Sequence, residues 1–580
     1  MLTAREAPPR GAEGEVQPRG GVLGTPALVA LIWLVAASGT LLLLWGSKLT
    51  FLLDDWEFLL YRRGFNAHAI LDPHGEHISV VPVLIYKALL ATFGMGSALP
   101  FRVVSTALFL LSCVLLFVFL RRRIGDWLAL VGIALVLFLG AGFEDLLWSF
   151  QVGYFGSMAA GLGALLALER DERGGDALAC GLLVVSILFS SLGLPFLIGV
   201  FVLVLLREDR WRRIYVVVVP AVVYAVWWLG WGHTAESAAS LSNLARTPAF
   251  VANGVAASFA SACGLALPSA GNLEWGRPLA VAGVLLALWR LSRARRVPPW
   301  FWALLAIGAS FWILAGVNQE AGRDPTSSRY QYVGVVFALL VAAELLRGVR
   351  LGRGWLAVVA VIAAGAVAGN LHYLHQAYLS YRVTSQLEKA DLGAVELARS
   401  TVEPGFVLSE DLADTAYVHV EAGPYLSARD AFGSPAYDPS ELAEAPSNAR
   451  YAADKVLFGA LRLAVVDAPS SALPRSRPEL ANGGGLFSVP ARGCLRVDSK
   501  GTASPLLSLP PGGAIFGAGA APIEDIRLAR FSEGEFPIDF QRQLAPGRVA
   551  KLEIPADGSP VRWRLQLETA GTATVCGLSS

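Results

Sequence analysis

The stretch that decides the fold is an unbroken apolar segment, Thr25-Pro-Ala-Leu-Val-Ala-Leu-Ile-Trp-Leu-Val-Ala-Ala-Ser-Gly-Thr-Leu-Leu-Leu-Leu-Trp-Gly46. A helix of about 22 residues is long enough to cross the hydrocarbon core of a bilayer, which is about 30 Å thick. The segment is too long for the core of a signal peptide, and no small-residue cleavage site follows it. We therefore expect an uncleaved first membrane span, preceded by a disordered cytoplasmic tail over residues 1–24.

The composition extends this expectation to much of the chain. Of the 580 residues, 54% are hydrophobic and only 16% are charged, and the mean hydropathy is +0.53. Globular proteins carry about 25% charged residues, so the chain is predicted to be a polytopic helical membrane protein with membrane lipids around it. Its net charge of +1 gives no general attraction to nucleic acid, which we exclude as a partner.

Arginine clusters between the apolar runs set the topology, because basic residues near helix ends mark the cytoplasmic side. Placing every cluster inside predicts eleven spans, over residues 25–46, 100–120, 127–142, 152–168, two within 177–206, 214–231, 279–291, 300–317, 332–346 and 355–370. The segment 177–206 is divided because one helix of that length would be about 45 Å long. Residues 78–93 are predicted to form an interfacial helix, and residues 248–267 a helix outside the membrane. The transmembrane domain then covers residues 25–371, in the plasma (inner) membrane, with a cytoplasmic N-terminus.

The C-terminal part is predicted to lie outside the cytoplasm. Residues 372–470 indicate a connecting helix and a small α/β segment, and the Pro-, Ser- and Gly-rich residues 469–485 indicate a linker. Apolar and polar residues then alternate, as in Val561-Arg-Trp-Arg-Leu-Gln-Leu-Glu568, which favours a β-sandwich over residues 486–580. In an oxidising compartment Cys494 and Cys576 would form a disulfide, and two free thiols are the alternative.

Three polar clusters are predicted on the outer side. The first loop contains Asp54-Asp55-Trp-Glu57 and His74-Gly-Glu76-His77, and the two later loops contain Glu144-Asp145 with Gln151, and Arg323, Arg329, Tyr330 and Tyr332. Carboxylates are costly beside hydrocarbon, so adjacent acids at a span end point to a chemical role. A carboxylate can take the proton of an acceptor hydroxyl, and the fork of arginine fits the oxygens of a departing phosphate. No phosphate-binding glycine loop supports the use of a nucleotide.

These motifs resemble the GT-C superfamily of membrane glycosyltransferases, which includes protein O-mannosyltransferases and lipid A aminoarabinose transferases. The resemblance covers residues 25–370 and rests on Asp54-Asp55, the following interfacial helix, Glu144-Asp145 and Ser328-Arg329-Tyr330. It implies a cell-envelope enzyme that transfers a hexosyl or pentosyl group, with inversion, from a polyprenyl-phosphate donor to a glycan, lipid or protein acceptor. It also implies that Asp54 or Asp55 is the base and that Arg323, Arg329 and Tyr330 bind the donor phosphate. The bias of the composition towards Ala, Arg, Gly and Val indicates a bacterial source.

Each motif also has a structural interpretation. The acidic pairs could be solvated loop residues, and Arg329 could extend towards the membrane surface or pair with Asp324. His74, Glu76 and His77 could contact substrate or hold a divalent cation, the one cofactor that the sequence suggests. Lys87 is expected to anchor its helix at the interface.

Two other functions fit the composition: a transporter or flippase of lipid-linked sugars, and a non-catalytic envelope protein that binds glycan. Transport coupled to ions usually needs ionisable groups near the middle of the membrane, and the predicted spans contain almost none there. An enzyme, unlike a scaffold, requires the carboxylates and arginines of the three loops to face one site.

Overall fold

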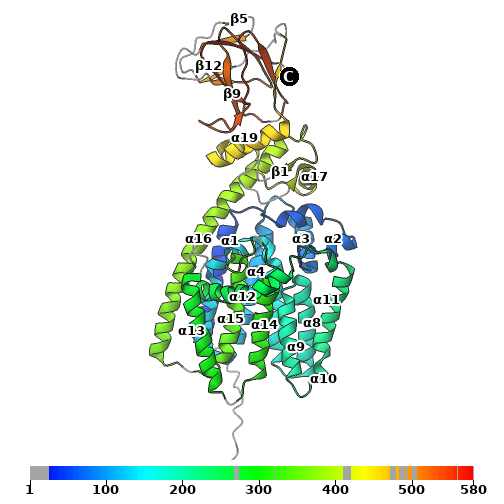
Figure 1. Cartoon of the computed structure of the whole chain (residues 1–580), viewed down its shortest axis with the longest axis vertical. Helices are drawn as coiled ribbons and strands as arrows, with labels where there is room; N and C mark the ends of the chain where they lie inside the picture. Colours follow the sequence, from blue (N-terminus) through cyan, green and yellow to red (C-terminus); the bar gives the residue numbers. More distant parts are fainter. Residues whose placement is uncertain are drawn as a thin grey trace, which may run out of the picture.

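The computed structural model describes residues 25–266, 273–294, 296–320, 322–349, 351–408, 420–469, 479–482, 490–491, 494–498, 506–557 and 559–578. The N-terminal tail predicted for residues 1–24 lies outside these residues. The described chain has two parts, a helical bundle and a β-rich C-terminal region, joined by the long helix α16 (Figure 1).

The helices of the bundle follow the apolar runs of the sequence. In chain order they are α1 (Thr25–Gly46), α2 (Ala67–Leu71), α3 (Val80–Phe93), α4 (Leu99–Ile124), α5 (Asp126–Leu137), α6 (Phe143–Leu147), α7 (Val152–Leu168), α8 (Arg173–Phe189), α9 (Gly193–Leu205), α10 (Arg210–Arg213), α11 (Tyr215–Gly230), α12 (Leu241–Ala262), α13 (Leu273–Ser292), α14 (Pro299–Val317), α15 (Ser328–Leu345) and α16 (Arg353–Leu397). Short helical turns precede or separate some of them: η1 (Glu57–Tyr61), η2 (Gly140–Gly142), η3 (Ser149–Gln151) and η4 (Gly232–Thr234).

Each of the eleven predicted spans coincides with a helix, and the segment 177–206 is divided into α8 and α9 as expected. The number of spans is not confirmed. Within the described residues five helices are long and apolar enough to cross a membrane, or six if the bent pair formed by α5 and the segment Gly140–Leu147 counts as one. Helices α3, α9 and α11 are shorter apolar helices.

The break after α5 positions the second acidic pair. The segment Gly140–Leu147 is bent by 43° relative to α5. At the bend the backbone passes so close to α16 that a Cβ on Gly140 would lie 1.8 Å from the carbonyl oxygen of Asn370. The Asn370 side chain also accepts a hydrogen bond of 3.2 Å from the backbone N–H of Ala141. Glycine is therefore required here, and the bend turns Glu144 and Asp145 away from the axis of α5.

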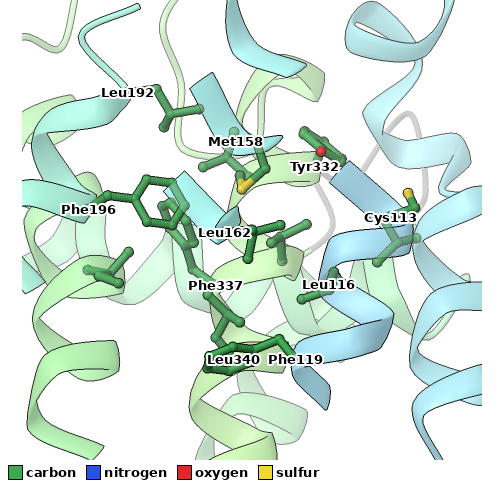
Figure 2. Close-up of a cluster of buried hydrophobic side chains, with 14 of the residues drawn as sticks. Cys113, Leu116, Phe119, Met158, Leu162, Leu192, Phe196, Tyr332, Phe337 and Leu340 are labelled. Carbon is green, nitrogen blue, oxygen red and sulfur yellow. The ribbon is translucent and has the colours of Figure 1, made fainter. Parts of the chain in front are cut away.

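The core of the bundle lies where α4, α7, α9 and α15 meet (Figure 2). Phe196 of α9 packs edge-on against Phe337 of α15, with 5.4 Å between ring centroids. Gly161 of α7 lies directly beneath the Phe196 ring, because a Cβ there would be 2.4 Å from it. These contacts hold the helices that carry the two later polar loops.

Helix α16 connects the bundle to the C-terminal region after residue 397, named the outer region for its place at one end of the molecule (Figure 1). Its 45 residues correspond to a length of about 68 Å, more than twice the thickness of a hydrocarbon core. Figure 1 shows it running along the bundle and continuing to α19 (Ser447–Leu461), below the β-rich region. The first loop, with α2 and α3, lies at the end of the bundle that faces this region, and α10 with its arginines lies at the opposite end.

The outer region begins with a small α/β segment. Its elements are β1 (Val407–Leu408), β2 (Val420–Glu421), α17 (Ala422–Phe432), α18 (Pro439–Glu444) and α19. The remaining strands are β3 (Val465–Asp467), β4 (Glu479–Asn482), β5 (Pro490–Ala491), β6 (Cys494–Asp498), β7 (Leu506–Ser508), β8 (Gly512–Ala518), β9 (Ile523–Ala529), β10 (Ile538–Asp539), β11 (Val549–Ile554), β12 (Arg564–Thr569) and β13 (Thr572–Gly577).

These strands form two antiparallel sheets, ordered β10-β9-β12-β7-β4 and β3-β11-β8-β13-β6-β5, whose buried side chains share one cluster. The predicted boundary at residue 486 lies inside this region, because β3 and β4 pair with its strands. Strand β4 also occupies part of the segment predicted as a linker. The structure joins Cys494 of β6 and Cys576 of β13, 82 residues apart, in a disulfide.

The disulfide predicts how the β-rich region responds to its removal. Cys494→Ser combined with Cys576→Ser should lower the unfolding free energy of this region by about 2–5 kcal/mol, because a closed loop restricts the unfolded chain. The change is measured by heating the protein and monitoring unfolding of the outer region through its loss of protease resistance. Cys113→Ser, at a buried free thiol of the bundle, serves as the control. Equal protease resistance of the double variant and the native protein would contradict the expectation.

Candidate active site

The His74-Gly75-Glu76-His77 motif forms a tight turn. The backbones of His74 and His77 exchange two hydrogen bonds of 3.0 and 2.9 Å, and Gly75 has a φ of +52°. A positive φ at this position favours glycine. The turn fixes both histidines relative to each other and brings His74 back to the first acidic cluster.

His74 lies between two carboxylates of that cluster. Its Nδ1 is 2.5 Å from an oxygen of Glu57, and its Nε2 is 3.3 Å from Oδ2 of Asp54. Glu57 also pairs with Arg62, whose Nη1 and Nη2 donate to the carbonyl oxygens of Asp72 and Pro73. Ion pairs and hydrogen bonds between residues of the first loop therefore hold its two ends together.

These contacts separate the two histidines chemically. Burial opposes protonation of His74, but its bonds to Asp54 and Glu57 outweigh burial and raise its pKa to about 9. Burial lowers the pKa of His77 to about 4, opposed by the charge of Glu76. At neutral pH His74 is thus an imidazolium and His77 a neutral imidazole. The His77 Nδ1 has no hydrogen-bond partner among the described residues.

The two adjacent aspartates have different environments. The Asp54 side chain is 44% exposed, whereas Asp55 is fully buried. Asp55 accepts hydrogen bonds from the Leu52 N–H at 3.0 Å, from the Ser149 hydroxyl at 2.9 Å, and from the Tyr86 hydroxyl. Burial raises its pKa to about 6, although these donors favour the charged form. Both oxygens of the Asp55 carboxylate are therefore engaged in hydrogen bonds with other groups of the protein.

Lys87 is buried, contrary to the expectation of an interfacial anchor. Its ammonium donates to the carbonyl oxygens of Arg62 and Gly64 and lies 4.8 Å from the centroid of the Phe65 ring. Lys87 thus provides hydrogen bonds to two backbone carbonyl groups that directly follow η1, and these bonds support the position of Arg62.

The third polar cluster contacts both of the others. Arg323 forms ion pairs with Glu76 of the first loop and, at 2.8 Å, with Glu320. Arg329, at the start of α15, pairs with Glu144 at 3.4 Å and not with Asp324. The Glu144 carboxylate also accepts the backbone N–H of Arg329 at 3.2 Å, which ties α6 to the N-terminus of α15.

Two aromatic positions connect these pairs into one group. His77 interacts electrostatically with His74, Asp54, Glu76 and Arg323. Its ring meets that of Tyr154 edge-on, with 6.0 Å between centroids. Tyr154 in turn interacts electrostatically with Glu76, Asp145, Arg329 and Tyr330. Together with the Arg323–Glu76 and Arg329–Glu144 ion pairs, these contacts bring side chains from all three predicted loops into one group.

The other predicted residues of the later loops are more buried. Asp145 is fully buried, and neither of its carboxylate oxygens has a hydrogen-bond partner among the described residues. Tyr330 packs against Phe250, Phe311 and Trp312. Tyr332 is buried with its hydroxyl 2.7 Å from that of Ser112 in the bundle core, so it is not part of the polar group.

Sequence reasoning missed Tyr86, Ser149 and Tyr154, which hold Asp55 and connect the clusters. Tyr86 precedes Lys87 on the predicted interfacial helix, and Ser149 follows Trp148 near the second acidic pair. Neither position carries a motif, because its role depends on where Asp55 lies in the fold. It also missed that Trp56 donates to Glu388 of α16, which connects the first loop to the long helix.

The metal hypothesis for His74, Glu76 and His77 gains no support. Within the described residues no three His, Cys, Asp or Glu side chains are arranged to hold a metal ion. His74 and Glu76 are paired with other charged groups instead.

No protein-family model matches the chain, and no curated protein matches it. Among solved structures, the chain is similar to ArnT from Cupriavidus metallidurans, crystallised bound to undecaprenyl phosphate. The identity is 14% and the TM-score 0.41, over 72% of this chain and 90% of that one. The fold and composition define a mostly helical protein with apolar helices suited to a membrane and a β-rich C-terminal region.

The charge state of His74 predicts a pH dependence of stability. Its folded pKa of about 9 exceeds the ordinary value near 6.5. The stabilisation is therefore fully present below about pH 6.5 and is lost as the pH rises towards 9. His74→Gln should lower the melting temperature of the purified protein more at pH 6 than at pH 9.5. His68→Gln, at an exposed histidine of the same loop, should change the melting temperature by the same amount at both pH values. If His74→Gln lowered the melting temperature equally at pH 6 and pH 9.5, His74 would not be the charged group described here.

Proposed function

We propose that the protein is an inverting GT-C-like glycosyltransferase that moves a sugar from a polyprenyl-phosphate donor to a cell-envelope acceptor at the outer face of the membrane. The observation that carries the proposal is that ion pairs join three loops distant in sequence, since Arg323 pairs with Glu76 of the first loop and Arg329 pairs with Glu144 of the second. A carboxylate for the acceptor and arginines for the phosphate both belong to this group. A scaffold would have no need to bring them together.

Asp54 is the proposed base. A general base must reach the substrate, and Asp54 is partly exposed whereas the Asp55 carboxylate is buried and hydrogen-bonded on both oxygens. The contact of Asp54 with His74 engages Oδ2. Asp55 in this proposal has a positioning role, because its bonds fix the backbone from which Asp54 emerges.

Arg329 is the better candidate for the donor phosphate. Its side chain is 40% exposed, and its ion pair with Glu144 is long at 3.4 Å. Arg323 is more buried and is neutralised by both Glu76 and Glu320. A phosphate can therefore compete for Arg329 at a lower cost, since fewer contacts are lost. Glu144 then holds the guanidinium when no donor is bound.

The proposed reaction is a single displacement. Asp54 takes the proton of the acceptor hydroxyl, and the acceptor oxygen forms a bond to the anomeric carbon on the face opposite the leaving group. The bond from that carbon to the phosphate oxygen breaks, and the polyprenyl phosphate leaves with the electron pair beside Arg329. The configuration of the sugar carbon inverts.

The base assignment is tested by Asp54→Asn. Sugar transfer from polyprenyl-phosphate donors to extracted envelope acceptors should fall by about 10²–10⁴-fold, because the amide cannot accept the proton. The melting temperature should fall no further than it does for His74→Gln, because Asp54 is only one of the two carboxylates beside that imidazolium. Asp72→Asn is the matched control, an aspartate of the same loop whose side chain is also 44% exposed and which pairs only with His68 among the described residues. Retained transfer in Asp54→Asn would remove this residue from the mechanism.

The phosphate assignment is tested by comparing Arg329→Gln with Arg323→Gln. Loss of a charge-assisted contact to phosphate costs about 1.5–3 kcal/mol, so Arg329→Gln should weaken donor binding by about 10–100-fold. Arg323→Gln should lower the melting temperature instead, because it leaves Glu76 unpaired. Isothermal titration of the purified variants with a polyprenyl phosphate measures donor binding, and thermal unfolding of the same variants measures the melting temperature. The opposite ranking of the two variants in donor binding would contradict the assignment.

A further inference from the structure

A pocket in the outer region lies far along the molecule from the polar group of the bundle. Its volume is about 390 Å³, within the range of small-molecule sites. It forms where the ends of three strands of the five-stranded sheet meet helix α18, and its lining residues are Ala443, Ser508, Arg530, Phe531, Glu533, Pro560, Val561, Arg562 and Arg564.

Strand register places two polar side chains on the wall of this pocket. Arg564 of β12 lies directly opposite Ser508 of β7, and the next pair is Leu565 with Leu507. Directly opposed residues share a face of the sheet, and successive residues alternate between faces. Because both leucines are fully buried in the sandwich core, Arg564 and Ser508 lie on the outer face.

The segment after β9 is held rigidly against helix α19. The buried carboxylate of Asp454 accepts the backbone N–H groups of Arg530, Phe531 and Ser532, each at 3.0 Å, and the Ser532 hydroxyl at 2.8 Å. One side chain thus fixes three consecutive residues, of which Arg530 and Phe531 line the pocket. The site is preorganised, which reduces the entropy lost on binding a ligand.

Arg530 is a structural member of the wall. Its guanidinium pairs with both oxygens of Asp557, at 2.6 and 2.7 Å, and donates to the Val561 carbonyl at 3.1 Å. It lies between the rings of Phe531 and Trp563. Its charge is neutralised and its role is to hold the segment that includes Pro560 and Val561.

Arg564 differs because no carboxylate neutralises it. Among the described residues its guanidinium donates only to the carbonyl oxygens of Ser532 and Arg530. Glu533, at the same pocket, is mostly exposed and pairs with Arg450 at 3.1 Å. The pocket therefore offers an unneutralised cation beside a carboxylate and a hydroxyl, against the apolar wall of Phe531, Pro560 and Val561.

We propose that this pocket binds an acidic sugar unit of a glycan, with the sugar carboxylate on Arg564 and sugar hydroxyls on Glu533 and Ser508. A simple anion would need only the arginine and would be repelled by Glu533. A neutral sugar would leave the Arg564 charge unpaired. A sugar ring that bears a carboxylate and hydroxyl groups satisfies both charged residues, because its carboxylate pairs with Arg564 and its hydroxyls donate to Glu533. The apolar wall suits the C–H groups of the ring. The proposal is independent of the transferase activity, because it concerns binding in the outer region alone.

The test is isothermal titration of the full chain in detergent with trigalacturonic acid, maltotriose and triglutamate. We expect trigalacturonic acid to bind at least about tenfold more tightly than the neutral or the peptide probe, with an affinity that falls as salt is added. Arg564→Gln should weaken this binding by about tenfold or more. Arg548→Gln is the control, an exposed arginine of the outer region away from the pocket lining.

A second variant keeps the test valid if Arg564→Gln disturbs the fold. Ser508→Tyr fills the pocket from the outer face and leaves every arginine in place, so it should abolish binding while the melting temperature stays near that of the native protein. Equal binding of maltotriose would show that the charge is irrelevant, and tighter binding of triglutamate would assign the pocket to acidic peptides. Either result, or no binding of trigalacturonic acid, overturns the proposal.

Discussion

The buried carboxylate of Asp55 is the constraint on which the rest of the polar group depends. A charge removed from water is tolerated only when donors surround it, and here the donors come from the first loop, from α3 and from the turn before α7. Satisfying this one group therefore joins three segments that are distant in sequence. It also decides the direction of its neighbour, since consecutive residues cannot both enter the same buried site, and Asp54 is left at the surface beside His74.

Charges at the opposite end of the bundle are arranged differently. Buried Arg123 pairs with Glu169 at 2.5 Å and with Glu344 at 2.7 Å, and Arg213 pairs with Asp171, Asp176 and Asp209. These arginines are saturated by short contacts and hold helices together. In the polar group near the outer region, by contrast, Asp54 and Arg329 are partly exposed and make longer contacts. Groups held in this way keep the capacity to exchange a partner for a ligand.

Sequence patterns predicted the helices well, because a run of apolar residues long enough for a membrane has few other stable conformations. Helix α1 has the predicted bounds of 25–46, and α7 those of 152–168. The strands were less predictable. Strand β4 lies in a segment that was expected to be a linker, since its pairing with β7 depends on residues 24 or more positions away. The number of spans is equally undetermined by hydropathy, because short apolar helices such as α9 and α11 satisfy the pattern without the length.

The sequence by itself determined the apolar helices, the polar C-terminal region and the three groups of charged residues that interrupt the helices. Local hydrophobicity and charge suffice for these features. Only the tertiary structure decided that Asp55 is enclosed while Asp54 is exposed, and that Arg329 contacts Glu144 and Arg323 contacts Glu76. It also decided that Arg564 forms no ion pair with any carboxylate in the described part of the chain. Each of these outcomes depends on which distant donors and acceptors the packed helices and paired strands bring within a few ångströms, and that information is not local to any segment.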